Sequence, residues 1–515
     1  MRINVAKNSK RNMLVGVTNR SIQVVLPFIT RSVIVQVLNS QYLGLNSLFT
    51  SILQVLSLSE MGFGVAMVYH MYKPIAEDDQ QTINALLNLY RKVYRIIGVC
   101  ILAIGASLIP FLPYLIKGSY PQGINLTLVY SIELLNTVLS YFLFGYKQSL
   151  LIAYQREDVK SFAILITQIG MQATQILFLF LTKNYYLFVL CMHVFTAVNN
   201  LWIGYMTKKM YPEAKCEGSL DKSIIGSIKK LVAGSFIQKA CATTRNSLDS
   251  ICVSVFLGLT QTAIYNNYFV ILNAVRMVTY IMIDSLAGGI GNHVALKDAE
   301  ENYQELKKTD FLYMLICGWC TIALLCLFQP FMRLWMGDEM MLPISSVILF
   351  AFYFYTTKIG DIKSNYTTAR GLWWKMKWRS IGETVVNLVL NIVLGMIWGI
   401  NGIIVATAIS LIVCNFFWGA SILFDDYFDK KKLWDYFLYH IKYLAVTAAF
   451  GAVTYFACEF IPVKNGILSL VIRAGVCLVL PTALYLLAYG RTTLFKESIK
   501  IMNIKKFRKN KGTNA

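Results

Sequence analysis

Long apolar stretches, each the length of a membrane-spanning helix, alternate with short polar connections along the whole chain. A helix that crosses the hydrocarbon core needs about 20 predominantly apolar residues. The sequence therefore predicts an all-α, polytopic membrane protein of about 14 transmembrane helices, with no connection long enough for an extramembrane domain. The predicted spans are residues 12–36, 43–71, 93–116, 123–147, 161–182, 185–206, 230–257, 262–290, 311–332, 342–365, 380–399, 402–424, 441–460 and 466–489.

Composition excludes a soluble fold. Of the 515 residues, 56% are apolar and 15% are charged, against roughly 45–50% and 25% in soluble domains. The basic N-terminus leads into the first span without a cleavage site, so we expect that span to be retained. The eleven cysteines lie mostly in apolar runs and the four histidines have no ligand spacing, which predicts core packing and no metal site.

The basic residues are concentrated in the loops on one side of the membrane. The chain carries 48 Lys and Arg against 27 Asp and Glu, a formal charge of +21. With the N-terminus inside, 36 basic residues fall in cytoplasmic segments and 4 in outer loops, which predicts two cytoplasmic termini. Anionic membrane lipids, rather than nucleic acid, account for this charge.

Eight basic residues lie inside predicted spans, apart from Arg95, Lys147, Lys230 and Lys442, which lie at cytoplasmic span ends and count with the cytoplasmic segments. Each costs about 2.5–3.5 kcal/mol at the bilayer centre unless water or a partner compensates it. They therefore point to a hydrated, cationic interior, in which the function must lie. They are Arg20, Arg31, Lys239, Arg245, Arg276, Lys358, Lys363 and Arg473.

Arg20 and Arg31 are eleven residues apart, which places them on one helix face about 16 Å apart. This spacing predicts a cationic cavity wall, unless the two side chains extend to opposite membrane surfaces. Arg473 has a simpler explanation, since it can pair with Glu459.

On the seventh span, Arg245 and Asp249 have i,i+4 spacing. They either neutralise each other or form part of a cavity wall. The neighbouring polar residues Gln238, Thr244 and Ser247 interrupt any lipid-facing apolar stripe, and they favour the cavity wall.

Two further spans carry mixed charges. In the eighth span, Arg276 and Asp284 flank Tyr280 at spacings of four residues. Lys358, Asp361 and Lys363 follow one another in the tenth. The basic residues of both sets are predicted to line the cavity, with pairing inside each span as the alternative.

Carboxylates inside spans are candidates for exchanging H⁺ or Na⁺, because such a cation needs a titratable or ion-binding group. Structural salt bridges are the alternative for each. The candidates are Glu60, Glu133, Asp249, Asp284 and Asp361.

Four segments near the N-terminus carry a resemblance to a known family. They are residues 42–49 (YLGLNSLF), 56–64 (LSLSEMGFG), 72–79 (YKPIAEDD) and 90–95 (YRKVYR). They resemble the polysaccharide repeat-unit flippases of O-antigen, capsule and exopolysaccharide pathways, in the multidrug/oligosaccharidyl-lipid/polysaccharide exporter superfamily. The resemblance is strongest over residues 12–100.

The resemblance implies two six-helix lobes, at 1–220 and 221–427, followed by two further helices and a basic tail at 428–515. A short repeat, 44–49 against 264–269, is consistent with this division. The implied activity is alternating-access flipping of an undecaprenyl-diphosphate-linked oligosaccharide across the bacterial cytoplasmic membrane, in contact with pathway proteins such as a polymerase. The residues implied to bind this cargo are Arg20, Arg31, Arg245, Arg276, Lys358, Lys363, Tyr265, Asn266 and Tyr268.

Three other classes of protein are alternatives. A multidrug exporter or peptidoglycan-precursor flippase of the same superfamily is the nearest alternative, although the basic excess opposes cationic drugs as cargo. A membrane-bound polymerase or glycosyltransferase needs a sizeable outer loop with catalytic acids, and every outer loop here has about ten residues or fewer. We therefore expect no enzyme activity. A scaffold without transport leaves the intramembrane charges unexplained.

Overall fold

The structure, a computed structural model, describes residues 5–60, 63–461 and 465–502. In this part of the chain all regular secondary structure is helical and no strand occurs. The predicted all-α, polytopic architecture is therefore confirmed.

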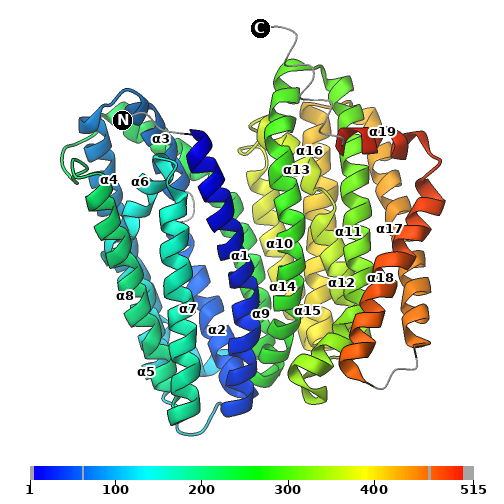
Figure 1. The fold of residues 1–515 in the computed structure, drawn as a ribbon, viewed down its shortest axis with the longest axis horizontal. Coiled ribbons are helices and arrows are strands. Elements are labelled where there is room, and N and C mark those ends of the chain that lie inside the picture. Colours follow the sequence, from blue (N-terminus) through cyan, green and yellow to red (C-terminus); the bar gives the residue numbers. More distant parts are fainter. Residues whose placement is uncertain (1–4, 61–62, 462–464, 503–515) are drawn as a thin grey trace. The chain divides into compact units, whose positions relative to one another are not determined.

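Two compact units divide the chain, residues 1–266 and 267–515. The boundary falls inside α10 (Leu259–Leu296), whose first two turns belong to the first unit. In Figure 1 the first unit runs from blue to green and the second from green to red. The other helices of the first unit are α1 (Val5–Val37), α2 (Ser40–Leu56), α3 (Phe63–Ala76), α4 (Gln80–Ser107), α5 (Leu126–Phe142), α6 (Gln148–Ala153), α7 (Glu157–Thr182), α8 (Tyr185–Met210) and α9 (Lys222–Leu257).

The second unit contains the rest of α10 and nine further α-helices among its described residues. A π-helical segment, Leu411–Trp418, joins two of them. The helices are α11 (Ala299–Met336), α12 (Ile344–Lys358), α13 (Asp361–Ala369), α14 (Lys377–Trp398), α15 (Ile400–Ser410), α16 (Gly419–Asp426), α17 (Leu433–Glu459), α18 (Gly466–Tyr489) and α19 (Thr493–Met502).

The predicted lobe boundary near residue 220 falls in the connection between α8 and α9. The compact units divide later because α9 packs against α2 and α3. This packing is close: a Cβ placed on Gly44 of α2 would lie 2.0 Å from the Leu259 carbonyl oxygen. Only a glycine allows the turn between α9 and α10 to approach α2 in this way.

All fourteen predicted spans are occupied by helix, but several helices are broken. The span 43–71 is interrupted by a 3₁₀ turn at Ser57–Glu60, and 342–365 is interrupted at Gly360. The span 93–116 bends by 58° and 123–147 bends by 48°.

Among the described residues, nine helices are long and apolar enough to cross a membrane, or eleven if each bent pair is one span. The remaining predicted spans contain α2–α3, α9 and α12–α13, which are short or carry charges. Polar and broken helices persist in membranes where protein or water-filled cavities surround them. Each of these three spans carries candidate site residues.

Side-chain caps fix several helix starts. The Asp79 carboxylate accepts a hydrogen bond from the Thr82 backbone N–H at the start of α4. Hydrogen bonds from Thr82 stabilise the charged form and lower the pKa of Asp79. Asn39, Asn125, Asn184, Asp298 and Asn465 cap other helices through the same type of contact.

An ion cluster connects α1 to the start of α7. Asp158 is buried and lies 2.7 Å from Arg11 Nη2 and 2.9 Å from Arg156 Nε. Arg156 also donates to the second carboxylate oxygen, and these contacts raise the pKa of Arg156. The cluster ties two helices that pack along their length.

The second unit is built around α11, which packs against α12, α17, α18 and α19. Its core is rich in buried aromatic side chains, including Tyr313, Tyr355, Tyr366 and Tyr436. In Figure 1, α17 is orange and α18 is orange-red. These two helices correspond to the two spans predicted to follow the two six-helix lobes.

Candidate functional site

In the first unit, a buried polar layer lies where α9 meets α10. Arg245 and Asp249 are one turn apart on α9, with exposed fractions of 8% and 1%. The Tyr265 hydroxyl of α10 lies 3.5 Å from Asp249 Oδ2. This layer therefore holds both charge signs and a phenol in the interior of the unit.

Arg31 of α1 reaches the same part of α10. Its Nη2 atom lies 3.5 Å from the Ala263 carbonyl oxygen, and its side chain is half-buried. Arg31 thus reaches the second turn of α10, close to Tyr265, which contacts Asp249 of α9. Arg20, by contrast, is exposed on α1.

Asn266 and Tyr268 make internal contacts. The Asn266 amide donates to Ser250 Oγ and to the Thr262 carbonyl oxygen, both at 2.9 Å. Tyr268, in the second unit, is fully buried, and its hydroxyl donates to Gln329 at 3.2 Å and accepts from the Leu342 N–H at 3.0 Å. Roles for Tyr265, Asn266 and Tyr268 in binding cargo stay predictions.

In the second unit, the break between α12 and α13 brings charges together. Gly360 has φ of +92°, which ends α12 and starts a new helix. Lys358 lies in the last turn of α12 and Asp361 in the first turn of α13, so each charge complements the dipole of its own helix end. Their Nζ and Oδ2 atoms are 3.1 Å apart, and Tyr313 donates to the same oxygen at 2.6 Å.

Lys363 belongs to a second buried network. Its ammonium group donates to the Asn415 backbone carbonyl oxygen, which lies in the π-helical segment. π-Helical segments shift the backbone hydrogen-bond pattern and often occur at functional sites. Arg379 Nη1 donates to Asn415 Oδ1 at 2.9 Å and to Glu383 Oε2 at 2.7 Å.

Arg379 and Glu383 are not among the residues predicted from the sequence, because Arg379 immediately precedes the predicted span 380–399 and Glu383 lies close to the start of that span. Their i,i+4 spacing was the available signal. Nor does the sequence predict the contact between Asp310 and His440, whose side chains come from α11 and α17 and lie 2.8 Å apart. No spacing in the sequence relates those two residues.

The other predicted residues are dispersed. Arg276 is half-buried on α10, whereas Asp284 is exposed. Arg473 Nη1 donates to Glu459 at 3.0 Å, as the pairing alternative predicts. Glu133 of α5 is buried, and its Oε1 has no hydrogen-bond partner among the described residues. The side chain of Glu60 lies outside the described residues.

A cavity of about 460 Å³ in the first unit is rich in tyrosine. It is formed mainly by α3, α4 and α6, with Lys160 of α7 at its wall. The Tyr90 hydroxyl donates to the Tyr94 hydroxyl at 3.1 Å, which fixes these two rings. Its polar and aromatic lining includes Tyr69, Tyr72, Tyr90, Tyr94, Gln148 and Lys160.

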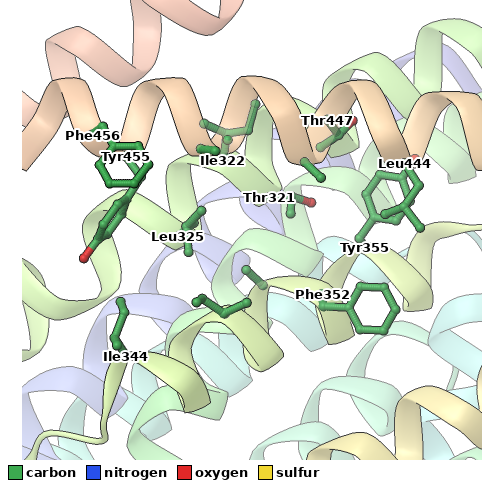
Figure 2. A pocket seen from close by; sticks show the side chains of 15 residues that line it. Thr321, Ile322, Leu325, Ile344, Phe352, Tyr355, Leu444, Thr447, Tyr455 and Phe456 are labelled. Atoms are coloured by element: carbon green, nitrogen blue, oxygen red, sulfur yellow. The ribbon is translucent and has the colours of Figure 1, made fainter.

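An apolar groove of about 400 Å³ lies in the second unit between α11, α12 and α17. Its two threonines direct their hydroxyls to internal partners: Thr321 to the Cys317 carbonyl oxygen and Thr447 to the Tyr485 hydroxyl. The remaining walls are almost entirely hydrocarbon and aromatic. Figure 2 shows the side chains that line it, among them Ile322, Leu325, Ile344, Phe352, Leu444, Tyr455 and Phe456.

Several solved structures of other proteins are similar to this chain in fold. The lipid II flippase MurJ, in an inward closed conformation, has a TM-score of 0.61 at 13% identity, over 93% of this chain and 99% of that one. An inward-facing multidrug resistance MATE family transporter of the MOP superfamily has a TM-score of 0.57 at 15% identity, over 78% and 94%. A MOP superfamily transporter from Pyrococcus furiosus, described as having a binding pocket of reverse polarity, has a TM-score of 0.52 at 13% identity, over 81% and 95%.

These likenesses show that the chain has the fold of MOP superfamily transporters. Together with its apolar helices, they identify a multi-pass membrane protein. No family model matches the sequence. No curated protein matches it either.

Proposed function

We propose that the protein is a flippase that moves undecaprenyl-diphosphate-linked oligosaccharide repeat units across the bacterial cytoplasmic membrane for surface polysaccharide synthesis. The observation that carries this proposal is that both units hold basic side chains in their interiors. Arg245 is 8%, Lys358 is 5% and Lys363 is 2% exposed. The half-buried Arg31 adds a further positive charge beside α10.

The barrier to flipping is the transfer of a charged, hydroxylated head group through hydrocarbon. Transfer of an unpaired ion or hydroxyl into an apolar medium is costly, so a carrier must offer compensating charges and hydrogen bonds. Arg forms bidentate hydrogen bonds with phosphate, and Lys supplies a compact positive charge. We assign attraction of the diphosphate to Arg31, Arg245, Lys358 and Lys363.

The tyrosine-rich cavity supports an oligosaccharide as the head group. Sugars present both apolar ring faces and hydroxyls, and sites for such ligands combine aromatic walls with a few polar groups. Tyr72 and Tyr90 supply aromatic surface here, while Gln148 and Lys160 supply hydrogen-bonding groups.

The apolar groove supports a lipid-linked rather than a water-soluble cargo. Its walls expose few polar groups, so a hydrocarbon chain can lie in it at little desolvation cost. Because α17 forms one wall, we assign this helix a role in holding the polyprenyl tail while the head group crosses.

Exchange of H⁺ or Na⁺ is proposed to drive the cycle. Glu133 is the strongest candidate, because a buried carboxylate oxygen without a partner is available to a cation or a proton. A polysaccharide polymerase or another pathway protein is the expected partner on the outer side, and both termini are expected in the cytoplasm.

The test is accumulation of lipid-linked repeat units in the inner leaflet after deletion of the gene. We expect rescue by the wild type and failure of rescue by Arg31→Ala and Arg245→Ala at equal membrane levels. Arg333→Ala is the control, because Arg333 is an exposed residue paired with Asp338, and it should rescue. Unchanged surface polysaccharide without accumulation would refute the proposal.

A peptidoglycan-precursor flippase is the second candidate, favoured by one observation. The MurJ structure covers 93% of this chain, against 78% for the inward-facing MATE structure. Complementation of a strain lacking its lipid II flippase distinguishes the two: growth supports the second candidate, and no growth with restored surface polysaccharide supports the first. A multidrug exporter is the weaker alternative, because buried Lys and Arg repel cationic drugs.

A further inference from the structure

Three cysteines that are far apart in the sequence meet in the second unit. Cys326 comes from α11, Cys458 from the last turn of α17 and Cys477 from α18. Their sulfur atoms all lie within 4.8 Å of one another, and no side chain is more than 1% exposed. We call these three residues the thiol cluster.

The surroundings of the thiol cluster are apolar. It packs with Ile322 and Tyr485, and partly buried aromatic side chains surround this core. Among the described residues, no His, Asp or Glu joins the three sulfurs as a fourth ligand. The nearest charges on the adjoining turns are Arg473 and Glu459, which pair with each other at 3.0 Å.

Ligand type and number narrow the choice of ion. Thiolates select soft ions, and structural zinc sites are almost always four-coordinate. A three-sulfur set without a fourth ligand therefore favours an ion that accepts three-fold coordination.

Charge narrows the choice further. Three thiolates around a monovalent ion leave a net charge of −2, and around a divalent ion −1, whereas a trivalent ion gives a neutral adduct. Burial of uncompensated charge in an apolar cluster is costly. Neutrality therefore favours a trivalent, thiophilic element.

From the thiol cluster we propose a three-thiolate binding site for trivalent arsenic, supplied as arsenous acid. Each of the three thiols gives its proton to one hydroxyl group of As(OH)₃, which leaves as water. Three As–S bonds form, three As–O bonds break and three waters are released, with no change in oxidation state. The adduct joins α17 and α18 covalently to α11. This inference does not depend on the proposed function.

The experiment uses the purified full-length protein, reduced with a phosphine so that no added thiol competes. Arsenite is titrated, excess is removed, bound arsenic is counted, and thiols that remain reactive are counted after denaturation. The expected result is one arsenic per chain and the loss of three reactive thiols from the eleven cysteines. This readout needs no variant, so it stands even if a substitution impairs folding.

Variants then locate the bound ion. Loss of an outer-shell contact weakens metal binding about tenfold. A larger loss of arsenic affinity is expected for each of the three variants that remove a sulfur ligand, Cys326→Ser, Cys458→Ser and Cys477→Ser. Cys414→Ser, a buried cysteine outside the cluster, should bind as the wild type does, and so should Cys317→Ser and Cys320→Ser.

Four outcomes would overturn the proposal. The first is that no arsenic binds, and the second is that two thiols are lost instead of three. The third is that Cys317→Ser loses binding while the cluster variants keep it. The fourth is that Cu⁺ or Zn²⁺ binds stably at the thiol cluster and excludes arsenite.

Discussion

His440 Nε2 lies 2.8 Å from Asp310 Oδ2, and both side chains are at least 98% buried. Asp310 belongs to α11, the central helix of the second unit, and His440 belongs to α17. The contact therefore connects these two helices where they pack together. The Tyr439 hydroxyl donates to the same carboxylate oxygen at 3.3 Å. The imidazole ring also packs against Tyr436 and Phe416.

Replacing His440 with Ala should therefore destabilise the second unit. The substitution leaves a buried carboxylate with one partner fewer and removes a packed ring, and loss of such a partner costs about 1–3 kcal/mol, more for a charged group. Thermal unfolding in detergent is the measurement. Leu438→Ala, at an exposed position of the same helix, is the control and should unfold close to the wild-type temperature. Equal unfolding temperatures for His440→Ala and the wild type would contradict the structural role.

The two explanations of Arg245 predict different behaviour of a double variant. If Arg245 only neutralises Asp249, the combination of Arg245→Gln and Asp249→Asn removes both charges and should restore transport that either change alone abolishes. If Arg245 attracts a diphosphate, the double variant should stay as inactive as Arg245→Gln. We expect the second result, read as lipid-linked repeat units that still accumulate. Gln and Asn are uncharged but still polar, so the main difference between the variants and the wild type is charge.

The sequence predicted the helical architecture, and up to eleven of its fourteen spans pass the test of length and apolarity among the described residues, because apolar length is read directly from neighbouring residues. The pairing of Arg473 with Glu459, across the short connection between α17 and α18, was also among the readings of the sequence, and the three-residue spacing of Lys358 and Asp361 permits the contact that the structure shows. The sequence could not predict contacts between distant segments. Asp310 with His440, the π-helical carbonyl that meets Lys363, and the thiol cluster all depend on tertiary packing, which hydrophobic periodicity does not encode.

At Gly360, in the break between α12 and α13, a side chain would cause both backbone strain and crowding with a neighbouring side chain. The Gly360 φ of +92° disfavours any side chain, at a cost of about 1–2 kcal/mol. An added Cβ would also lie 3.2 Å from Lys363 Cε. Gly360→Ala should therefore lower stability and displace Lys363, which reduces transport.

Gly371→Ala is the matched control, since Gly371 has φ of +66° and no atom within 4 Å of an added Cβ. It should lose similar stability in thermal unfolding but keep transport, measured as rescue of the deletion strain at equal membrane levels. Equal transport by the two variants would show that the position of Lys363 is unimportant.

The apolar groove gives a prediction about cargo that is independent of charge. Ala448 lines the groove from α17, so Ala448→Phe should fill part of its volume. If the groove holds a polyprenyl tail, this variant should flip lipid-linked units poorly while it unfolds near the wild-type temperature, because added apolar bulk in an open groove costs little packing energy. Val453→Phe is the matched control, since Val453 is exposed on the same helix and does not line the groove.

If Val453→Phe restores flipping and Ala448→Phe does not, the polyprenyl tail lies in the groove during transport. Full rescue by both variants would mean that the tail stays in the surrounding lipid throughout, and the head group alone would then enter the protein.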